Sequence, residues 1–306
     1  MTPEIDHKRI FIIGCNGQLG HDALDVLPPD YTVTGADLPD IDITSPESVA
    51  TVLGPAAPGV VLNCAAYTNV DKCETDQDAA RAVNVEGPRL LAKYAEAHGA
   101  LLVHVSTDYV FDGTRPPPAP YTEEDRPNPQ TFYGLTKFEG EVAVRAIAQR
   151  HLIVRTAWLY GVHGNNFLKT MLRLAISNPE KTIRVVNDQH GCPTWSERLA
   201  RQIKVLIARG KPGLYHATGE GQCTWFDLAS AFLRLMNVSH KIEPCTTADY
   251  PTPAKRPANS ILENRALKEA DLHVMKHWHD DLAEYVRRHR EALLAETRAK
   301  LATAGK

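Results

Sequence analysis

The stretch that decides the fold reads Arg9-Ile10-Phe11-Ile12-Ile13-Gly14-Cys15-Asn16-Gly17-Gln18-Leu19-Gly20. The apolar run at residues 9–13 is typical of a central parallel strand, which is buried on both faces. Glycines follow it at three-residue spacing, and residues 18–27 have a helical pattern. Glycine lets the backbone approach a ligand closely, and a helix N-terminus binds anionic groups such as a pyrophosphate. The stretch predicts a dinucleotide-binding unit, although a glycine-rich turn without a ligand is the alternative.

The rest of the first half continues this alternation of strands and helices. Runs that predict strands lie at residues 31–36, 60–64, 101–105 and 152–155, and helical patterns lie at residues 78–98 and 131–149. Ser45 followed by Pro46 marks another helix start, because serine caps helices and proline suits their first position. Residues 1–160 are therefore expected to form an α/β domain that binds NAD(P), with a Rossmann-like, doubly wound parallel sheet.

The second half changes character from about residue 161. Short helices and strands alternate here, with helical patterns at residues 167–177, 194–208, 224–236 and 280–298 and strands clearest at residues 184–186 and 213–216. We expect residues 161–306 to form mainly a smaller, discontinuous α+β substrate domain, with the chain returning to the large sheet at about residues 182–216. The tail from Ala283 is rich in alanine and charged residues, which predicts a solvated helix that frays at its end.

Composition excludes several classes of protein. Of 306 residues, 43% are hydrophobic and 23% are charged, which gives ample material for a core. A net charge of −3 gives no sign of binding to a nucleic acid polymer or an anionic membrane. The six cysteines contain no C-x-x-C pair, which argues against a zinc site and a disulfide framework. With no leader-like N-terminus and no apolar run of bilayer length, the sequence predicts a soluble cytoplasmic protein.

The end of the second predicted strand indicates which dinucleotide is bound. Asp37 lies about 20 residues after the glycines, where an acidic side chain hydrogen-bonds the adenosine ribose. No lysine or arginine lies between Arg9 and Lys72 to meet a 2′-phosphate, so NADH is expected to serve at least as well as NADPH. Ala65 and Ala66 either lie against the cofactor or only allow tight packing. The residues assigned to the cofactor site are Gly14, Asn16, Gly17, Gln18, Leu19, Gly20, Asp37, Asp42, Ile43, Ala65, Ala66, Tyr67, Asn84, Tyr133 and Lys137.

A tyrosine and a lysine four residues apart, Tyr133 and Lys137, mark the predicted catalytic helix. Positions i and i+4 share one face of a helix, so the phenol and the ammonium point to the same side. A nearby cation lowers the pKa of a phenol, whose ordinary value is about 10. Such a phenol can exchange a proton with a carbonyl group near neutral pH, as carbonyl reduction requires. The pattern alone is common on ordinary helices, and it becomes informative only with the rest of the chain.

Hydroxyl groups follow the fourth predicted strand at Ser106 and Thr107. Ligands bind beyond the carboxyl ends of parallel strands, which places these hydroxyls at the site unless they only cap a turn. Trp158 could flank the substrate or belong to the core. Arg256 could clamp a diphosphate or lie on the surface. Asn84, on the predicted helix 78–98, is interpreted as a brace for the site, against the alternative of a solvated side chain.

Three motifs together resemble the extended short-chain dehydrogenase/reductases: Gly14-x-x-Gly17-Gln18-x-Gly20, Ser106-Thr107-Asp108-Tyr109-Val110-Phe111 and Tyr133-x-x-x-Lys137. The resemblance narrows to the dTDP-4-dehydrorhamnose reductases and covers nearly the whole chain, through residues 155–161, 165–167, 187–194, 213–216 and 250–257. It implies hydride transfer from NADH or NADPH to the 4-keto group of dTDP-4-dehydrorhamnose, giving dTDP-L-rhamnose for cell-surface polysaccharides. It also implies Tyr133 as the general acid, Lys137 as its electrostatic partner and Thr107 as a second hydrogen-bond donor to the ketone.

The resemblance further implies a dTDP-sugar as the bound partner and allows a homodimer. The residues assigned to the substrate are Thr107, Asp108, Tyr109, Val110, Trp158, Asn166 and Arg256. Some family members are linked to Mg²⁺ at a dimer interface, but the sequence places no carboxylates for it, and no metal ligand is assigned. Two alternatives stay open: a reductase of another dTDP-4-keto-deoxysugar, and a non-catalytic regulatory subunit like the β chain of methionine adenosyltransferase. Retention of Thr107, Tyr133 and Lys137 together favours an enzyme.

Overall fold

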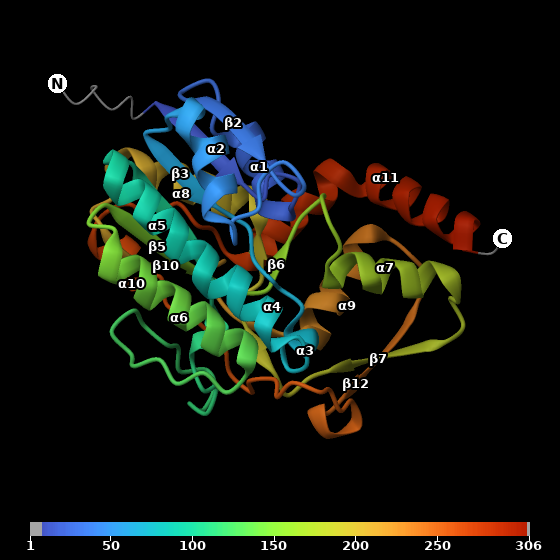
Figure 1. The fold of residues 1–306 in the computed structure, drawn as a ribbon. Coiled ribbons are helices and arrows are strands. Elements are labelled where there is room, and N and C mark those ends of the chain that lie inside the picture. Colours follow the sequence, from blue (N-terminus) through green and yellow to red (C-terminus); the bar gives the residue numbers. More distant parts are fainter. Residues whose placement is uncertain (1–7, 305–306) are drawn as a thin grey trace.

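The structure, a computed structural model, describes residues 8–304. Its centre is a six-stranded sheet (Figure 1) in the order β10-β5-β4-β3-β1-β2, with every neighbouring pair parallel. The strands are β1 (Arg9–Ile13), β2 (Thr32–Ala36), β3 (Val60–Asn63), β4 (Leu101–Thr107), β5 (His151–Thr156) and β10 (Gly213–His216). The strand order reverses between β1 and β3, so their carboxyl ends are the expected place for a ligand.

Helices cover both faces of this sheet, because alternate residues of its strands are apolar on both sides. The helices are α1 (Gln18–Val26), α2 (Pro46–Ala56), α5 (Gly87–His98), α6 (Phe132–Ile147) and α8 (Ser196–Arg209). Ile10 and Ile12 face one apolar layer, to which α1 and α8 contribute. Phe11 and Ile13 face the other layer, to which α2, α5 and α6 contribute. The predicted Rossmann-like, doubly wound parallel sheet is confirmed.

Capping confirms two predicted helix starts. Ser45 Oγ accepts a 3.2 Å hydrogen bond from Ser48 N, with Pro46 in the first turn of α2. Thr131 Oγ1 accepts a 3.0 Å hydrogen bond from Gly134 N at the start of α6. The helix predicted at residues 78–98 is divided into α4 (Gln77–Arg81), a π-helical turn (Ala82–Glu86) and α5. Such π turns are frequent at functional sites.

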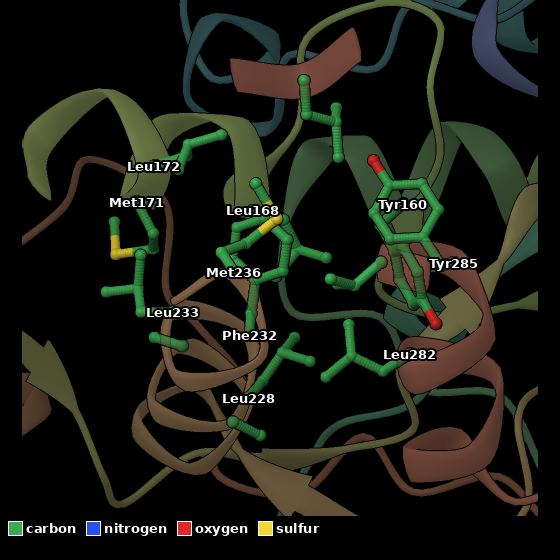
Figure 2. Packing of buried hydrophobic residues seen from close by; sticks show 14 of the residues in the cluster. Tyr160, Leu168, Met171, Leu172, Leu228, Phe232, Leu233, Met236, Leu282 and Tyr285 are labelled. Carbon is green, nitrogen blue, oxygen red and sulfur yellow. The ribbon is translucent and has the colours of Figure 1, made fainter. Parts of the chain in front are cut away.

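The second half builds its own core around α7 (Phe167–Ser177), α9 (Trp225–Met236) and α11 (Trp278–Ala304). These helices lie to the right of the large sheet in Figure 1. Figure 2 shows Leu168, Phe232 and Leu282 among the apolar side chains that pack together between them. The helix expected from Ala283 is observed as part of α11, but its expected solvation is wrong, because Tyr285 is fully buried in this core.

The return of the chain to the large sheet differs from the prediction. Strand β7 (Thr182–Val186) pairs with β12 (Lys241–Cys245) in a separate two-stranded sheet, so the expected return at residue 182 is wrong. Arg184 in the middle of β7 is exposed, whereas a central strand would bury it on both faces. Helix α8 and strand β10 make the return instead.

Short elements connect these parts. They are α3 (Val70–Cys73), β6 (Leu159–Tyr160), β8 (His190–Gly191), β9 (Thr194–Trp195), β11 (Cys223–Thr224), α10 (Arg265–Glu269) and two 3₁₀ turns, Asp108–Val110 and Thr247–Asp249. The first 3₁₀ turn follows β4 directly, so it holds the end of that strand beside the start of α6. Among the helices of residues 8–304, none has the length and apolar character needed to cross a membrane.

Candidate active site

Strand β4 and helix α6 bring Thr107, Tyr133 and Lys137 together. Thr107 is the last residue of β4, and its hydroxyl lies close to the phenol of Tyr133 near the start of α6. Thr107 Oγ1 also donates to Asp108 Oδ1 at 2.8 Å. One turn further along α6, Lys137 Nζ donates to the carbonyl of Val105 on β4 at 2.7 Å. The three side chains expected to form one catalytic group thus lie at one end of the sheet.

Burial changes the acid–base properties that the sequence suggested. Desolvation raises the pKa of Tyr133, although the hydrogen bond with Thr107 acts in the opposite direction. The net lowering of this pKa that was expected from Lys137 is therefore not found, because burial outweighs any effect of the ammonium. Lys137 is only 2% exposed, and burial lowers its pKa from 10.5 to about 8. Tyr133 is a protonated phenol at neutral pH, which is the form that a general acid needs.

The glycine loop lies where the strand order reverses. Gly14 has a φ angle of 77°, and a Cβ there would lie 2.8 Å from Ala65 N, so the loop touches the end of β3 backbone to backbone. Gly17 is the N-cap of α1 and no side chain caps this helix, which leaves N–H groups for an anion. Asp37 accepts a 3.2 Å hydrogen bond from Asn16 N, so its carboxylate lies beside the loop. These residues fit a dinucleotide with its pyrophosphate on α1 and its ribose near Asp37.

Several residues assigned to the cofactor site also have a role in the fold. Leu19 and Ile43 bury their side chains in the two apolar layers of the sheet domain. Asp42 Oδ1 accepts hydrogen bonds from the backbone and hydroxyl of Thr44, at 2.9 and 2.7 Å, and so forms the turn before α2. These residues follow strand ends, and position alone does not distinguish a core contact from a ligand contact.

Asn84 is a brace rather than a cofactor contact, because it is fully buried in the π turn. Its Oδ1 accepts from Tyr67 N at 2.9 Å, and its Nδ2 donates to the Tyr67 carbonyl and to Thr136 Oγ1, both at 3.1 Å. Asn84 thereby ties the loop after β3 to α6. The bracing expected from the sequence is observed, and its assignment to the cofactor site is corrected.

A cavity of about 930 Å³ lies beside this group, lined by parts of α7, β7 and the loops around residues 245–260. Its volume is in the range of small-molecule sites, about 300–1,000 Å³. One wall of the cavity is aromatic and consists of Trp158, Phe167 and Trp225. The two indole rings are stacked, with 3.5 Å between their centroids. Trp158 has a φ angle of 46°, which is rare for a bulky residue and is a kind of strain found at binding sites. A Cβ on Gly191 would lie 2.3 Å from this indole, so only glycine leaves room for it.

Tyr109 connects the cavity to the catalytic group. It lines the cavity, and its ring lies edge-on to that of Tyr133, with 5.6 Å between the ring centroids. Arg256 also lines the cavity, and its Nη2 donates to Asp71 Oδ2 at 2.7 Å. Asp71 in turn holds the backbone of Ala254 at 3.1 Å, so it fixes the segment that contains Arg256. The cavity thus has an oriented guanidinium, suited to a phosphate group, and an aromatic wall.

Four residues assigned to the substrate do not line this cavity: Thr107, which lies at the end of β4 within the catalytic group, and three that support the structure around it. Val110 is fully buried in a small apolar cluster. Asp108 is buried beneath Thr107, and desolvation raises its pKa to about 6. Asn166 caps α7 and donates to Gln18 Oε1 at 2.8 Å, which ties the glycine loop to α7. All three belong to matching sequence motifs, but a motif also includes residues that only support the site.

Sequence reasoning missed Asp71, Trp225 and Glu141. Asp71 follows an ordinary helix cap, and its partner Arg256 is 185 positions away in the sequence, so no local pattern predicts their contact. Glu141 lies eight residues after Tyr133 on the same helix, and that spacing was a usable signal. Within residues 8–304, no group of three or more histidine, cysteine or acidic side chains is placed to hold a metal ion.

A doubly wound sheet that places a phenol and an ammonium beside a glycine loop defines the class of short-chain dehydrogenases/reductases. Within that class, the chain belongs to the family of the RmlD substrate binding domain, whose model matches residues 8–291.

Relatives support this placement at high coverage. A dTDP-4-dehydrorhamnose reductase of Streptomyces griseus is 40% identical, over 90% of this chain and 92% of that protein. A dTDP-4-keto-6-deoxy-D-glucose reductase of Streptomyces niveus is 39% identical, over 88% and 93%. The solved dTDP-4-dehydrorhamnose reductase of Bacillus anthracis, in complex with NADP, is 37% identical with a TM-score of 0.88, over 92% of this chain and 99% of that one.

Proposed function

We propose that this protein is an NAD(P)H-dependent reductase that converts the 4-keto group of dTDP-4-dehydrorhamnose to the hydroxyl of dTDP-L-rhamnose. The observation that carries the proposal is the grouping of Thr107, Tyr133 and Lys137 where the end of β4 meets the start of α6, next to a cavity of nucleotide-sugar size. The name of the Streptomyces griseus relative supports the choice of sugar. A regulatory subunit would have no need of a buried lysine with a lowered pKa on the same helix face as a phenol.

The roles of the side chains follow from their positions. A bound reduced nicotinamide would supply the hydride for the keto carbon. Tyr133 then gives its phenolic proton to the carbonyl oxygen, on which negative charge develops. Thr107 hydrogen-bonds the same oxygen and stabilises it more in the transition state than in the ground state. Lys137 stabilises the phenolate that Tyr133 becomes, and it binds the cofactor ribose.

We propose that the chain divides its tasks between its two halves. The six-stranded sheet, with the glycine loop and Asp37, binds the dinucleotide. The part around α7, α9 and β7 holds the dTDP-sugar in the cavity, with the sugar against Trp158 and Tyr109 and the diphosphate on Arg256. The aromatic wall and the guanidinium at the cavity support this orientation.

The direct test is oxidation of NADH and NADPH by the purified protein with dTDP-4-dehydrorhamnose, with the product identified by NMR. Formation of dTDP-L-rhamnose is the expected result. Cofactor oxidation without that product would contradict the stereochemistry, and no oxidation with any dTDP-4-keto sugar would contradict the enzyme itself.

A second sugar is favoured by one specific observation. The Streptomyces niveus relative is named a dTDP-4-keto-6-deoxy-D-glucose reductase and is about as similar as the rhamnose enzymes. The two substrates share the nucleotide and the 4-keto group and differ in the configuration of the ring. Comparing kcat/KM for both sugars decides between them, and a preference for the gluco-configured sugar would replace the first proposal.

We expect Asp37 to determine the preference between NADH and NADPH. Its carboxylate lies beside Asn16 of the glycine loop and repels a 2′-phosphate, and no lysine or arginine occurs between Arg9 and Lys72. We therefore expect kcat/KM with NADH to be at least equal to that with NADPH. Asp37→Ser should move the ratio toward NADPH by about tenfold or more, the value of one interaction with a charge. Asp40→Asn, in the same turn, is the matched control. A hundredfold preference of the unaltered protein for NADPH would contradict this prediction.

Arg256→Ala is expected to raise KM for the dTDP-sugar and to leave cofactor affinity unchanged. Arg256 is oriented by Asp71 at 2.7 Å, and loss of one hydrogen bond to a charged group is worth about 1.5–3 kcal/mol, or roughly tenfold to a hundredfold. Steady-state kinetics in the sugar measure KM, and nicotinamide fluorescence measures cofactor affinity. Lys255→Ala is the control, because it removes the neighbouring cation, which does not line the cavity. An unchanged KM would show that Arg256 does not touch the diphosphate.

A further inference from the structure

A buried ion pair lies directly behind the catalytic group. Glu141 on α6 is fully buried, and it accepts hydrogen bonds from Arg155 Nε at 2.8 Å and Arg155 Nη2 at 2.7 Å. Arg155 on β5 is only 1% exposed. Ser106 Oγ on β4 donates to the same carboxylate at 2.6 Å. The Glu141 carboxylate is therefore fixed by three hydrogen bonds from two neighbouring strands.

This carboxylate continues the line of catalytic side chains along α6. Tyr133, Lys137 and Glu141 are spaced at four residues, so they share one face of the helix, which lies against the end of β4. Three successive residues of β4 lie against them: Val105 accepts from Lys137, Ser106 donates to Glu141, and Thr107 lies close to Tyr133. The buried pair thus sets the position of α6 on the strand that provides Thr107.

Stability does not explain this arrangement. Removing two charges from water costs about as much free energy as their mutual attraction returns. Well-packed apolar residues commonly replace such a pair without loss of stability. The pair lies among the apolar layers of the sheet, where apolar side chains would fill the space. A buried charge of fixed position next to a catalytic ammonium therefore points to a role in the reaction.

The groups that face Lys137 leave Glu141 as the dominant charge. Burial raises the pKa of Cys64, after β3, to about 12, so its thiol is neutral. Burial lowers the pKa of His104 on β4, so its imidazole is neutral as well. Tyr133 is a protonated phenol on the same helix face. Burial lowers the pKa of Lys137, and the charge of Glu141 acts against that effect. Two further charges pair with Glu141 behind this face: Arg155 on β5, and Arg145 on α6 at 3.9 Å from Glu141 Oε2.

We propose that Glu141 is a positioning residue for the reduction: held by Arg155 and Ser106, it keeps Lys137 charged and in place beside Tyr133. This inference rests on the proposed function for its catalytic meaning, but its electrostatic content concerns the protein alone. Without the Glu141 charge, the hydrogen bond to the Val105 carbonyl would be left to oppose burial, which favours the neutral amine. The charge that supports the phenolate would then be lost at a lower pH.

The test measures the pKa of Lys137 directly, by NMR titration of protein labelled with ¹³C at lysine Cε, with the signal assigned by its loss in Lys137→Met. In Glu141→Gln, the pKa of Lys137 should fall by about one pH unit or more, the effect of one nearby opposite charge. Because a lysine loses its charge as pH rises through its pKa, the alkaline decline of kcat should move to lower pH by the same amount. Glu139→Gln, the same change two residues away on α6 at a partly exposed ion pair with Arg81, should move neither.

A second variant distinguishes the effect of losing the Glu141 charge from a failure of the protein to fold. Glu141→Gln leaves Arg155 buried without its partner, and the protein then has an unpaired charge to accommodate. The double variant Glu141→Met with Arg155→Met removes both charges and keeps the volume, so it should fold. The pKa of Lys137 should still fall, by less than in Glu141→Gln, because the charge of Arg155, which opposes the ammonium, is lost too. An unchanged pKa of Lys137 in a folded variant of either kind would overturn the inference. If the wild-type protein reduces no keto sugar while the pKa still falls, the proposed function fails and the link between Glu141 and Lys137 stands.

Discussion

Tyr133→Phe is expected to lower kcat by about 10²–10⁴-fold, the usual value of general acid catalysis. Phenylalanine keeps the ring, which packs edge-on against Tyr109 with 5.6 Å between the ring centroids, and removes only the hydroxyl that lies close to Thr107. Without that proton donor, the negative charge on the former carbonyl oxygen is left to Thr107 alone. Single-turnover hydride transfer, followed by the loss of nicotinamide absorbance, measures the chemical step free of product release.

Cofactor affinity should barely change in this variant, because the phenylalanine ring fills the same space. Tyr215→Phe is a suitable control. Tyr215 lies on the edge strand β10, and its phenol donates to the carbonyl of Lys211. That change should lower stability slightly and leave kcat unaltered. Near wild-type hydride transfer by Tyr133→Phe would remove Tyr133 from the chemistry and with it the proposed mechanism.

Lys137→Met is expected to weaken both catalysis and cofactor binding, which distinguishes Lys137 from Tyr133. Loss of its charge should lower kcat by about a hundredfold or more, within the range for acid–base catalysis. Loss of a charged hydrogen bond to the cofactor ribose should raise the cofactor Kd by roughly tenfold to a hundredfold. Nicotinamide fluorescence measures the Kd. A Kd equal to that of the unaltered protein would show that Lys137 does not hold the cofactor.

The same variant should be more stable than the unaltered protein at pH 7. Burial lowers the pKa of Lys137 from 10.5 to about 8, which corresponds to about 3 kcal/mol of destabilisation at neutral pH. Because the unfolded chain keeps this proton up to pH 10.5, the stability of the unaltered protein rises with pH between about 8 and 10.5, and that rise should disappear in Lys137→Met. Denaturant unfolding at pH 7 and pH 9.5 measures both effects. An unaltered pH dependence would contradict the burial of a lysine with a lowered pKa.

The sequence predicted the elements of the sheet domain because their signals are local. The strand at residues 9–13, the glycine spacing after it, and the caps at Ser45 and Thr131 each depend on a few neighbouring residues. The Tyr133–Lys137 spacing was informative for the same reason, since the helix itself fixes their common side. Asn84 was expected as a brace, but the sequence did not show that burial removes it from the cofactor site.

Other expectations failed where packing decides the outcome. The helix from Ala283 was expected to be solvated because charged residues dominate it, yet Tyr285 packs in the apolar core that α7 and α9 form. Val110 and Asp108 share a motif with Thr107, but they turn into the core and beneath the strand end. The sign of the pKa change at Tyr133 was reversed, because a helix pattern shows the nearby charge and does not show the loss of water.

The sequence by itself determined the fold class, the glycine loop at β1 and the shared face of Tyr133 and Lys137, because these follow from backbone preferences over a few residues. Only the tertiary structure decided which charges meet: Arg256 with Asp71, and Glu141 with Arg155 and Ser106. It also decided that Lys137 is buried and that its pKa is lowered to about 8. Pairing and desolvation depend on atoms brought from distant parts of the chain, and electrostatic energies are large only where that packing excludes water.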